Sequence, residues 1–261
     1  LAALLAALLA PPASAQLGID LSAPQKETPP KEKGAEQKGK KEPPRASSMS
    51  SSPHEKYLAV TVKEERYLSG QTRYPPLLSP LLVKRTTRGM RLAITGFTGP
   101  YVLPDDVESR TDHLVHVVAG SGAVPNFSIL KWSLVHHPKL RHTFLCSNKT
   151  FADVIFREEL AQLERTYPER LRVVHALTRD PVTPVSQGVW KGRVNAATLR
   201  AVIPDPAACL VYACGPAIGP FEKTAAAARG EPPKPRFLEA ALQALAEVGV
   251  PDARVKRESY G

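Results

Sequence analysis

Apolar and polar positions change their pattern near residue 112. Beyond that point, short continuous apolar runs such as residues 114–119 alternate with longer segments of helical apolar spacing, such as residues 125–136. A short continuous apolar run is typical of a strand buried on both faces of a parallel sheet. The other expected strands are residues 142–147, 171–177 and 208–213, and the other expected helices are residues 152–167, 195–202 and 235–248. This alternation predicts right-handed crossovers, so we expect residues 112–261 to form an α/β domain with a doubly wound parallel sheet.

The preceding segment, residues 45–111, has the pattern of a partial antiparallel β-barrel domain. Residues 58–63 and 90–95 alternate apolar and polar side chains, as half-buried strands do. Glycine and proline residues separate these two runs, and residues 76–84 are expected to form a short helix at the edge of the sheet.

Residues 1–44 lack the pattern of a folded domain and are interpreted as an apolar leader and a disordered linker. The leader joins an apolar run to Ala13-Ser14-Ala15. Three interpretations of it stay open: a truncated secretory signal peptide, an Ala/Leu helix of a preceding domain, or sequence outside the native reading frame. Residues 16–44 contain too few apolar side chains to offset the entropy of ordering, so we expect them to be disordered.

Charge narrows the possible partners. The chain carries a formal net charge of +10. Its densest basic tract, residues 38–41, lies in the expected linker and has no interleaved aromatic residues, so we expect no nucleic-acid binding. Basic surface suits docking of an acidic partner protein. The leading apolar run is too short for a bilayer-spanning helix, so no membrane span is expected.

The three cysteines, Cys146, Cys209 and Cys214, are an odd and sparse set. Such a set is not a disulfide framework and indicates a reducing, cytoplasmic compartment. Without a further cysteine pair, neither a zinc nor an iron–sulfur site is expected in this chain. The neighbouring histidines His136, His137 and His142 are expected to be solvated rather than to bind a metal.

Three motifs follow expected strands. Gly120-Ser121-Gly122 stands between the first strand and its helix, where glycine lets the backbone approach a phosphate and the helix offers free N–H groups. Cys214-Gly215-Pro216 follows a later strand, and Glu258 and Tyr260 end the chain's expected last strand. Ligands bind at the carboxyl ends of strands in open α/β sheets, so these motifs are expected to line one crevice.

In residues and in order, these motifs resemble those of the ferredoxin–NADP reductase family. Gly120-Ser121-Gly122 with Pro125 is similar to its pyrophosphate turn, and Cys214-Gly215-Pro216 is similar to its nicotinamide motif. Glu258-Ser259-Tyr260 resembles its terminal Glu-x-Tyr/Phe. The resemblance implies a Rossmann-like NAD(P) domain in which Cys214 and Glu258 are catalytic and position the nicotinamide, and in which Tyr260 contacts the cofactor.

The resemblance also places Ser147, Lys149 and Arg157 in the segment that meets the adenosine ribose. Cations at this position can bind a 2′-phosphate, which slightly favours NADPH over NADH.

Upstream, residues 45–48 resemble the family's Arg-x-Tyr-Ser flavin motif, with Ser47 in place of the aromatic residue that stacks on the flavin. The residues implied to contact FAD or FMN are Arg45, Ser47, Ser48, Thr61, Lys63 and Ser79. Residues 96–104 resemble the family's passage into the nucleotide domain. The family precedes its flavin motif with roughly half a barrel, which residues 16–44 cannot supply. Either another chain completes the barrel or the sequence is incomplete at its N-terminus.

The implied function is that of a flavoprotein, a flavin-dependent NAD(P)H oxidoreductase for electron transfer. Its electrons would pass to a separate acceptor: a ferredoxin, a Rieske protein or an oxygenase component. The alternative is a flavin-free dinucleotide-binding subunit with a regulatory or structural role, which Ser47 and the missing strands favour.

Overall fold

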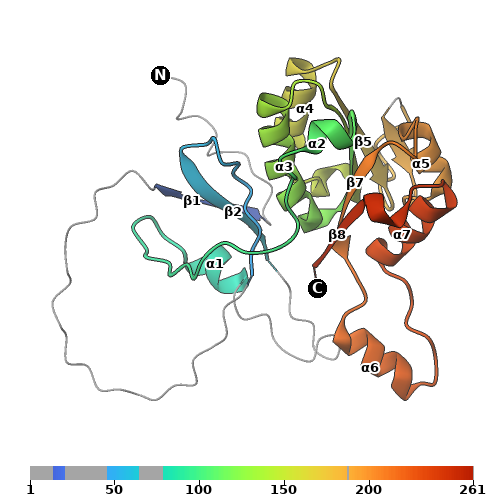
Figure 1. The fold of residues 1–261 in the computed structure, drawn as a ribbon. Helices are drawn as coiled ribbons and strands as arrows, with labels where there is room; N and C mark the ends of the chain where they lie inside the picture. Colours follow the sequence, from blue (N-terminus) through green and yellow to red (C-terminus); the bar gives the residue numbers. More distant parts are fainter. Residues whose placement is uncertain (1–13, 21–45, 65–78, 187, 261) are drawn as a thin grey trace.

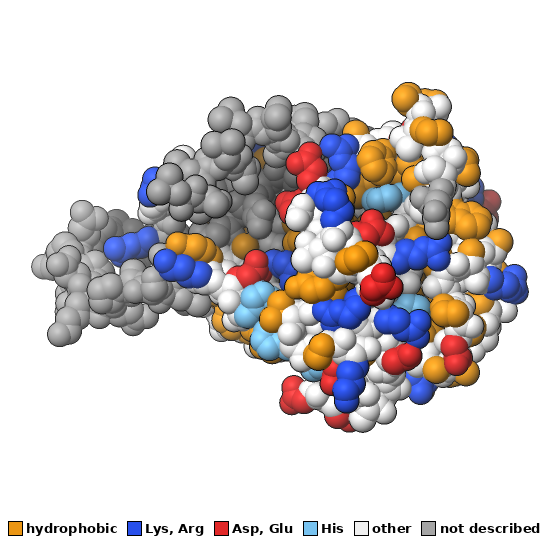
Figure 2. Space-filling model, turned by 90° about the horizontal axis from the view of Figure 1, so that it is seen from above, with side chains coloured by type: hydrophobic (Ala, Val, Ile, Leu, Met, Phe, Trp, Pro, Cys, Tyr) orange, Lys and Arg blue, Asp and Glu red, His pale blue; other side chains and the backbone are white. Residues whose placement is uncertain are grey.

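The computed structural model of the chain describes residues 14–20, 46–64, 79–186 and 188–260. Figure 1 shows an α/β domain with a small antiparallel β ribbon beside it. Basic, acidic and apolar side chains are interspersed on the face of the α/β domain shown in Figure 2. The net positive charge is therefore not gathered into one basic patch on that face.

The α/β domain is built on a six-stranded parallel sheet of order β6-β5-β4-β3-β7-β8. Its strands are β3 (His113–Ala119), β4 (Arg141–Asn148), β5 (Leu171–Leu177), β6 (Val189–Lys191), β7 (Leu210–Pro216) and β8 (Val255–Tyr260). All seven residues of the central strand β3 are buried, which explains why it is mostly apolar, with His113 and His116 as its two polar residues. The chain leaves β3 towards β4 and later returns to β7 on the other side of β3. This reversal is the point at which open α/β sheets bind ligands.

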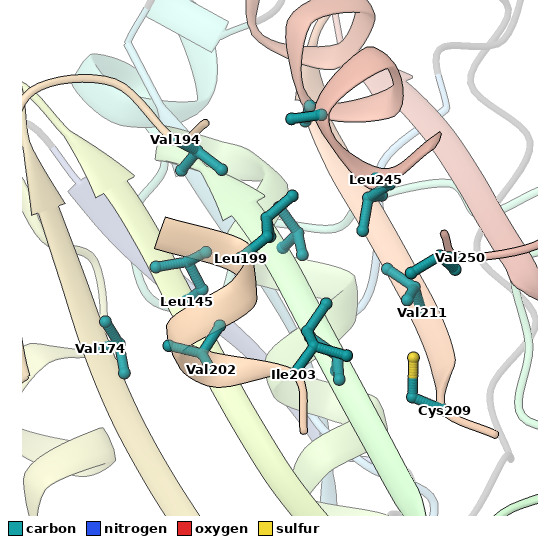
Figure 3. Close-up of a cluster of buried hydrophobic side chains, with 14 of the residues drawn as sticks. Leu145, Val174, Val194, Leu199, Val202, Ile203, Cys209, Val211, Leu245 and Val250 are labelled. Atoms are coloured by element: carbon teal, nitrogen blue, oxygen red, sulfur yellow. The ribbon is translucent and has the colours of Figure 1, made fainter. Parts of the chain in front are cut away.

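Helices cover both faces of the sheet (Figure 1). On one face, α3 (Ala123–His136) and α4 (Arg157–Thr166) pack through Phe127, Leu130 and Leu160. On the other, α5 (Ala196–Val202) and α7 (Phe237–Glu247) bury Leu199 and Leu245 against Val211, as Figure 3 shows. The remaining helices are α2 (Val107–Arg110), α6 (Pro220–Ala228) and the 3₁₀ turns η1 (Gly120–Gly122), η2 (Phe151–Asp153) and η3 (Asp252–Arg254).

The ribbon consists of β1 (Ser14–Asp20), which pairs antiparallel with β2 (Tyr57–Lys63), and α1 (Ser79–Arg85) lies against β2. It docks on α3. The Ser128 hydroxyl donates to the carbonyl of Ser51 at 2.6 Å, and Lys131 forms an ion pair with Glu55.

The expected strands and helices of residues 112–261 are confirmed, although the helix expected at 152–167 begins only at Arg157. The strand at 58–63 is also confirmed. The helix expected at 76–84 is α1, described from Ser79 to Arg85, and residues 76–78 lie outside the described part. Asn195 caps α5 by accepting a hydrogen bond from the backbone N–H of Thr198 at 2.9 Å. Residues 220–228 form α6, which Figure 1 shows extending away from the sheet.

Two expectations upstream were wrong. Residues 16–20 were expected to be disordered, but Ser14–Asp20 forms β1. Ala15, Leu17 and Ile19 alternate with other residues, as in a strand, and β2 is the strand with which they pair. Residues 21–45 lie outside the described part of the chain. The expected strand at 90–95 is irregular, with Met90 and Ile94 about half exposed. Alternation predicts a strand only where another strand is available to pair, and no described strand lies beside this segment.

The expectation that His142 is solvated was also wrong. His142 is 2% exposed and His116 is fully buried, and their rings stack at 5.6 Å between the sheet and α3. His116 Nδ1 lies 2.9 Å from Asn126 Oδ1, and His142 Nε2 lies 3.2 Å from the hydroxyl of Ser133. Burial lowers the pKa of His116 to about 4 and the pKa of His142 well below its ordinary value. Both rings are therefore neutral near neutral pH.

These two histidines should make the fold sensitive to acid. A histidine whose folded pKa is depressed stabilises the fold above its unfolded pKa of about 6.5, and this contribution is lost as pH falls towards the folded value. His116→Gln keeps a side-chain N–H for Asn126 but cannot titrate. Between pH 6.5 and 4, we expect the unfolding free energy of the variant to fall less steeply than that of the parent protein. The two slopes should differ by about 1.4 kcal/mol per pH unit. Denaturant unfolding across this range measures the slope, and comparison at pH 8 isolates any packing cost. Parallel curves for the variant and the parent protein would contradict the assignment.

Candidate functional site

The sheet register brings the sequence motifs to one edge. Val118 on β3 pairs with Cys214 on β7, and Cys214 pairs with Glu258 on β8. On the other side of β3, Ala119 pairs with Ser147 of β4. The carboxyl ends of four adjacent strands therefore carry the glycine turn η1, the Cys-Gly-Pro motif, the terminal motif and Ser147.

The glycine turn packs backbone to backbone on the Cys-Gly-Pro motif. A Cβ atom on Gly122 would lie 2.1 Å from the carbonyl oxygen of Cys214, so no other residue fits there without displacing the turn. Gly120 has a φ of 52°, in the left-handed region that glycine adopts readily. Gly215 is also restricted, because a Cβ on it would lie 2.5 Å from the ring of Phe237 at the start of α7, although this contact is with a side chain rather than with the backbone. Glycine is required at these positions by close contact and by backbone conformation.

Cys214 and Glu258 lie side by side on neighbouring strands, in surroundings that disfavour negative charge. Cys214 is fully buried, and burial followed by the nearby Glu258 carboxyl raises the pKa of its thiol well above the ordinary range. Burial also raises the pKa of Glu258, which is half-buried. A thiol that stays protonated is a poor nucleophile, so the geometry suits contact and positioning by Cys214 rather than covalent catalysis.

The expected adenosine side lies beyond the carboxyl end of β4. Ser147 is buried at the end of this strand, Lys149 is exposed after it, and Arg157 begins α4 with its guanidinium 5.3 Å from the ring centre of Phe151. Phe156, just before α4, has a φ of 60°, which is unfavourable for a bulky residue. Its buried ring stacks on Phe127 at 4.2 Å, and this packing fixes the start of α4 and hence the position of Arg157.

The expected flavin side meets the glycine turn, since β2 lies against η1. Thr61 on β2 has a buried hydroxyl with no hydrogen-bond partner among the described residues. Ser47 and Lys63 are exposed, whereas Ser48 and Ser79 are half-buried. Arg45 lies outside the described residues, and Tyr260 ends β8 opposite Pro216.

Sequence reasoning missed two residues of this site, Tyr101 and Asn126. Asn126, in the second turn of α3, donates to the carbonyl of Gly122 at 3.2 Å and to the Tyr101 hydroxyl at 2.9 Å. The ring of Tyr101 packs edge-on against Tyr212 at 5.3 Å. Tyr101 lies in the passage at 96–104, which the sequence indicated only as a connection; its aromatic position there was the available signal. A polar Asn126 on the buried face of α3 carries no motif of its own.

The described residues contain neither a metal-binding cluster nor a helix that could span a membrane. No cluster of three or more His, Cys, Asp or Glu side chains among them is arranged to hold a metal ion. None of the described helices combines the length and apolar character that crossing a membrane requires.

Comparisons with known proteins bear directly on this edge of the sheet. Residues 117–225 match the family model of the oxidoreductase NAD-binding domain. This match indicates an NAD-binding domain over those residues, and the α/β domain has the fold of solved ferredoxin–NADP reductases. The chain is 30% identical over 124 residues to NADH-cytochrome b5 reductase 2 of Botryotinia fuckeliana, which covers 46% of this chain and 35% of that protein.

The similarity extends upstream in other relatives. A component of the 1,2-phenylacetyl-CoA epoxidase of Escherichia coli is 27% identical over 179 residues, which covers 65% of this chain and 46% of that component. The ferredoxin–NADP⁺ reductase of Plasmodium falciparum has the same fold, with a TM-score of 0.54 and 16% identity over 83% of this chain and 77% of that one. The chain thus spans less than half the length of the two curated relatives.

Replacing Gly122 by alanine should weaken dinucleotide binding strongly. The added Cβ would displace the turn from Cys214, and a displacement of about 1 Å at such a site costs on the order of 100-fold in function. Isothermal titration with NADH measures the loss of affinity.

Gly230→Asn is the matched control, because Gly230 has a φ of 67° and open space around it. It should bind NADH as the parent protein does. If Gly122→Ala kept the parent affinity, the contact with Cys214 would not define the binding turn.

Proposed function

We propose that the chain is a flavin-dependent oxidoreductase that takes electrons from NADH and passes them to a separate acceptor protein. The observation that carries this proposal is the close contact of Gly122 with Cys214. It brings together the glycine turn, which resembles a pyrophosphate-binding turn, and the Cys-Gly-Pro motif, which resembles a nicotinamide-binding motif. The proposal covers the whole protein's activity, of which the α/β domain is one part.

In this proposal the dinucleotide lies along the carboxyl edge of the sheet. The backbone N–H groups of Gly120, Ser121 and Gly122 and the start of α3 bind the pyrophosphate. Ser147, Lys149 and Arg157 line the adenosine end. Cys214, Gly215 and Pro216 contact the nicotinamide together with Glu258, and Tyr260 lies nearby at the end of β8. This arrangement orients the donor ring and excludes water from it.

The ribbon side fits a flavin in one respect that the dinucleotide does not explain. The Thr61 hydroxyl is buried without a partner among the described residues, on a strand that lies against η1. Buried hydroxyls without a partner are costly, so a ligand that supplies one is favoured. Arg45, Ser47, Ser48, Lys63 and Ser79 are the further flavin contacts that we propose from the family resemblance. Held by these residues, a flavin would supply the chemistry of hydride acceptance and of single-electron release.

We propose FAD and NADH rather than FMN and NADPH. The relatives named above include an NADH-dependent reductase. Arg157, one of the two cations that would favour NADPH, is partly engaged by Glu158 at 3.5 Å and by the ring of Phe151. The preference for NADPH from the sequence stays untested.

The acceptor is proposed to be an acidic electron-carrying protein or oxygenase component. Relatives named for cytochrome b5 and for an epoxidase support both kinds, and the net charge of +10 favours an acidic partner. A cytoplasmic location stays a prediction.

An absorption spectrum and an anaerobic titration test the proposed activity. The purified full chain should show visible flavin bands, directly or after FAD is added, and NADH should bleach them faster than NADPH does. A chain that binds NADH but never acquires flavin bands would instead support the flavin-free dinucleotide-binding subunit, which the exposed Ser47 favours.

Thr61→Val separates a flavin contact from a structural role. The methyl group removes a buried hydroxyl that lacks a described partner, so the flavin-free variant should be more stable to urea by about 1 kcal/mol. If the hydroxyl binds flavin, the same variant should bind FAD about tenfold more weakly. Thr61→Ser, which keeps the hydroxyl, is the control. Equal FAD affinity in Thr61→Val and the parent would remove Thr61 from the flavin site.

A further inference from the structure

A chain of hydrogen bonds runs through the interior of the α/β domain and ends at the Tyr101 hydroxyl. From inside outwards, Ser133 Oγ lies 3.2 Å from His142 Nε2, and His142 Nδ1 lies 3.4 Å from His116 Nε2. His116 Nδ1 lies 2.9 Å from Asn126 Oδ1, and Asn126 Nδ2 lies 2.9 Å from Tyr101 Oη. Nothing in the proposed hydride donation uses the inner members of this chain.

The direction of every bond in the chain follows from one contact. The Gly122 carbonyl can only accept, so the Nδ2 of Asn126, 3.2 Å away, must face it and Oδ1 must face His116. His116 therefore carries its proton on Nδ1 and accepts at Nε2 from the Nδ1–H of His142. The Nε2 of His142 then accepts from the hydroxyl of Ser133. Both rings must be neutral for this pattern, as their burial requires.

This direction leaves the proton of Tyr101 for another acceptor. Asn126 donates to Tyr101 Oη, so the tyrosine does not donate back to it. No described residue accepts the Tyr101 proton. Burial, then the nearby Cys214, raises the pKa of Tyr101 well above its ordinary value, and Glu258 adds to this effect, so the proton stays on the oxygen. The hydroxyl therefore lies within electrostatic reach of the Cys214 and Glu258 side chains.

The geometry points to Tyr101 as a nicotinamide-binding residue that donates its hydroxyl proton to the carboxamide oxygen of the dinucleotide, with Asn126 and His116 as positioning residues. A primary carboxamide has an accepting oxygen beside a donating NH₂ group, and the Tyr101 hydroxyl and Glu258 carboxylate supply the complementary donor and acceptor. The proposal deepens the proposed function and rests on it. In this proposal Tyr101 and Glu258 recognise the carboxamide of the nicotinamide. The glycine turn cannot provide this recognition, because it is proposed to contact only the pyrophosphate.

The test compares two ligands that differ at the nicotinamide. Isothermal titration of the full chain with NAD⁺ and with ADP-ribose, which lacks the nicotinamide, gives a ratio of affinities. The parent chain should prefer NAD⁺. Tyr101→Phe should weaken NAD⁺ about tenfold and leave ADP-ribose within about twofold. A general disturbance of the fold would weaken both ligands, so the ratio reports the hydroxyl specifically.

Asn126→Asp tests the direction of the chain. A carboxylate has no N–H to donate, so Tyr101 would donate to it and lose its free proton. This variant should lower the preference for NAD⁺ as Tyr101→Phe does, and the double variant should lower it no further. Thermal unfolding of each variant confirms that it is folded at the titration temperature.

The outcomes separate the two proposals. If the parent chain binds neither ligand, the dinucleotide function fails and the Tyr101 proposal fails with it. If the parent binds both ligands but Tyr101→Phe leaves their ratio unchanged, or if the parent does not prefer NAD⁺, only the Tyr101 proposal is overturned.

Discussion

The contact between Gly122 and the carbonyl of Cys214 is the constraint on which the site depends. Two segments about ninety residues apart are held within a distance that excludes any side chain. The strand order of the sheet reverses between β3 and β7. The segments that follow these two strands can therefore come this close together at only this place in the sheet. Once Gly122 is seated, its own carbonyl orients the Asn126 amide, and Asn126 orients both Tyr101 and His116. The polar groups of the interior thus take their directions from the close packing of the turn.

Most of the α/β domain could be predicted from the sequence, because strands buried on both faces, such as β3, are predominantly apolar. The glycine turn and the Cys-Gly-Pro motif could also be recognised from the sequence, because close contacts restrict Gly122 and Gly215 to glycine. The three residues of β6 are too few to form a pattern. The burial of His116 and His142 could not be predicted for another reason. The sequence does not indicate whether a histidine in a strand is exposed to solvent or is neutral and buried in the core.

The ribbon shows the opposite limit. The run at 90–95 alternates as clearly as the run that becomes β2, yet only the latter has a partner strand in the described part of the chain. Alternation describes one face of a segment, and pairing depends on residues elsewhere. The same dependence produced β1 in a stretch whose surrounding composition indicated disorder. Tyr101 was missed for a related reason, since its role comes from Asn126 on another element rather than from its own neighbours in sequence.

The nicotinamide end of the proposed site is partly buried and carries little charge. Burial favours the protonated forms of Cys214, Tyr101 and Glu258, and it keeps His116 neutral. Oxidation of a reduced nicotinamide creates a positive charge on a ring that was neutral, and a poorly solvated site would oppose that change if nothing compensated it. Glu258 is the one acidic group of this set, and it pairs directly with Cys214 across β7 and β8. Its raised pKa reflects the cost of holding a carboxylate there without a cation, and that cost falls as the ring becomes positive. In the proposed reaction the carboxylate is therefore stabilised more in the product than in the reactant, while the neutral hydroxyl of Tyr101 orients the ring without opposing its charge.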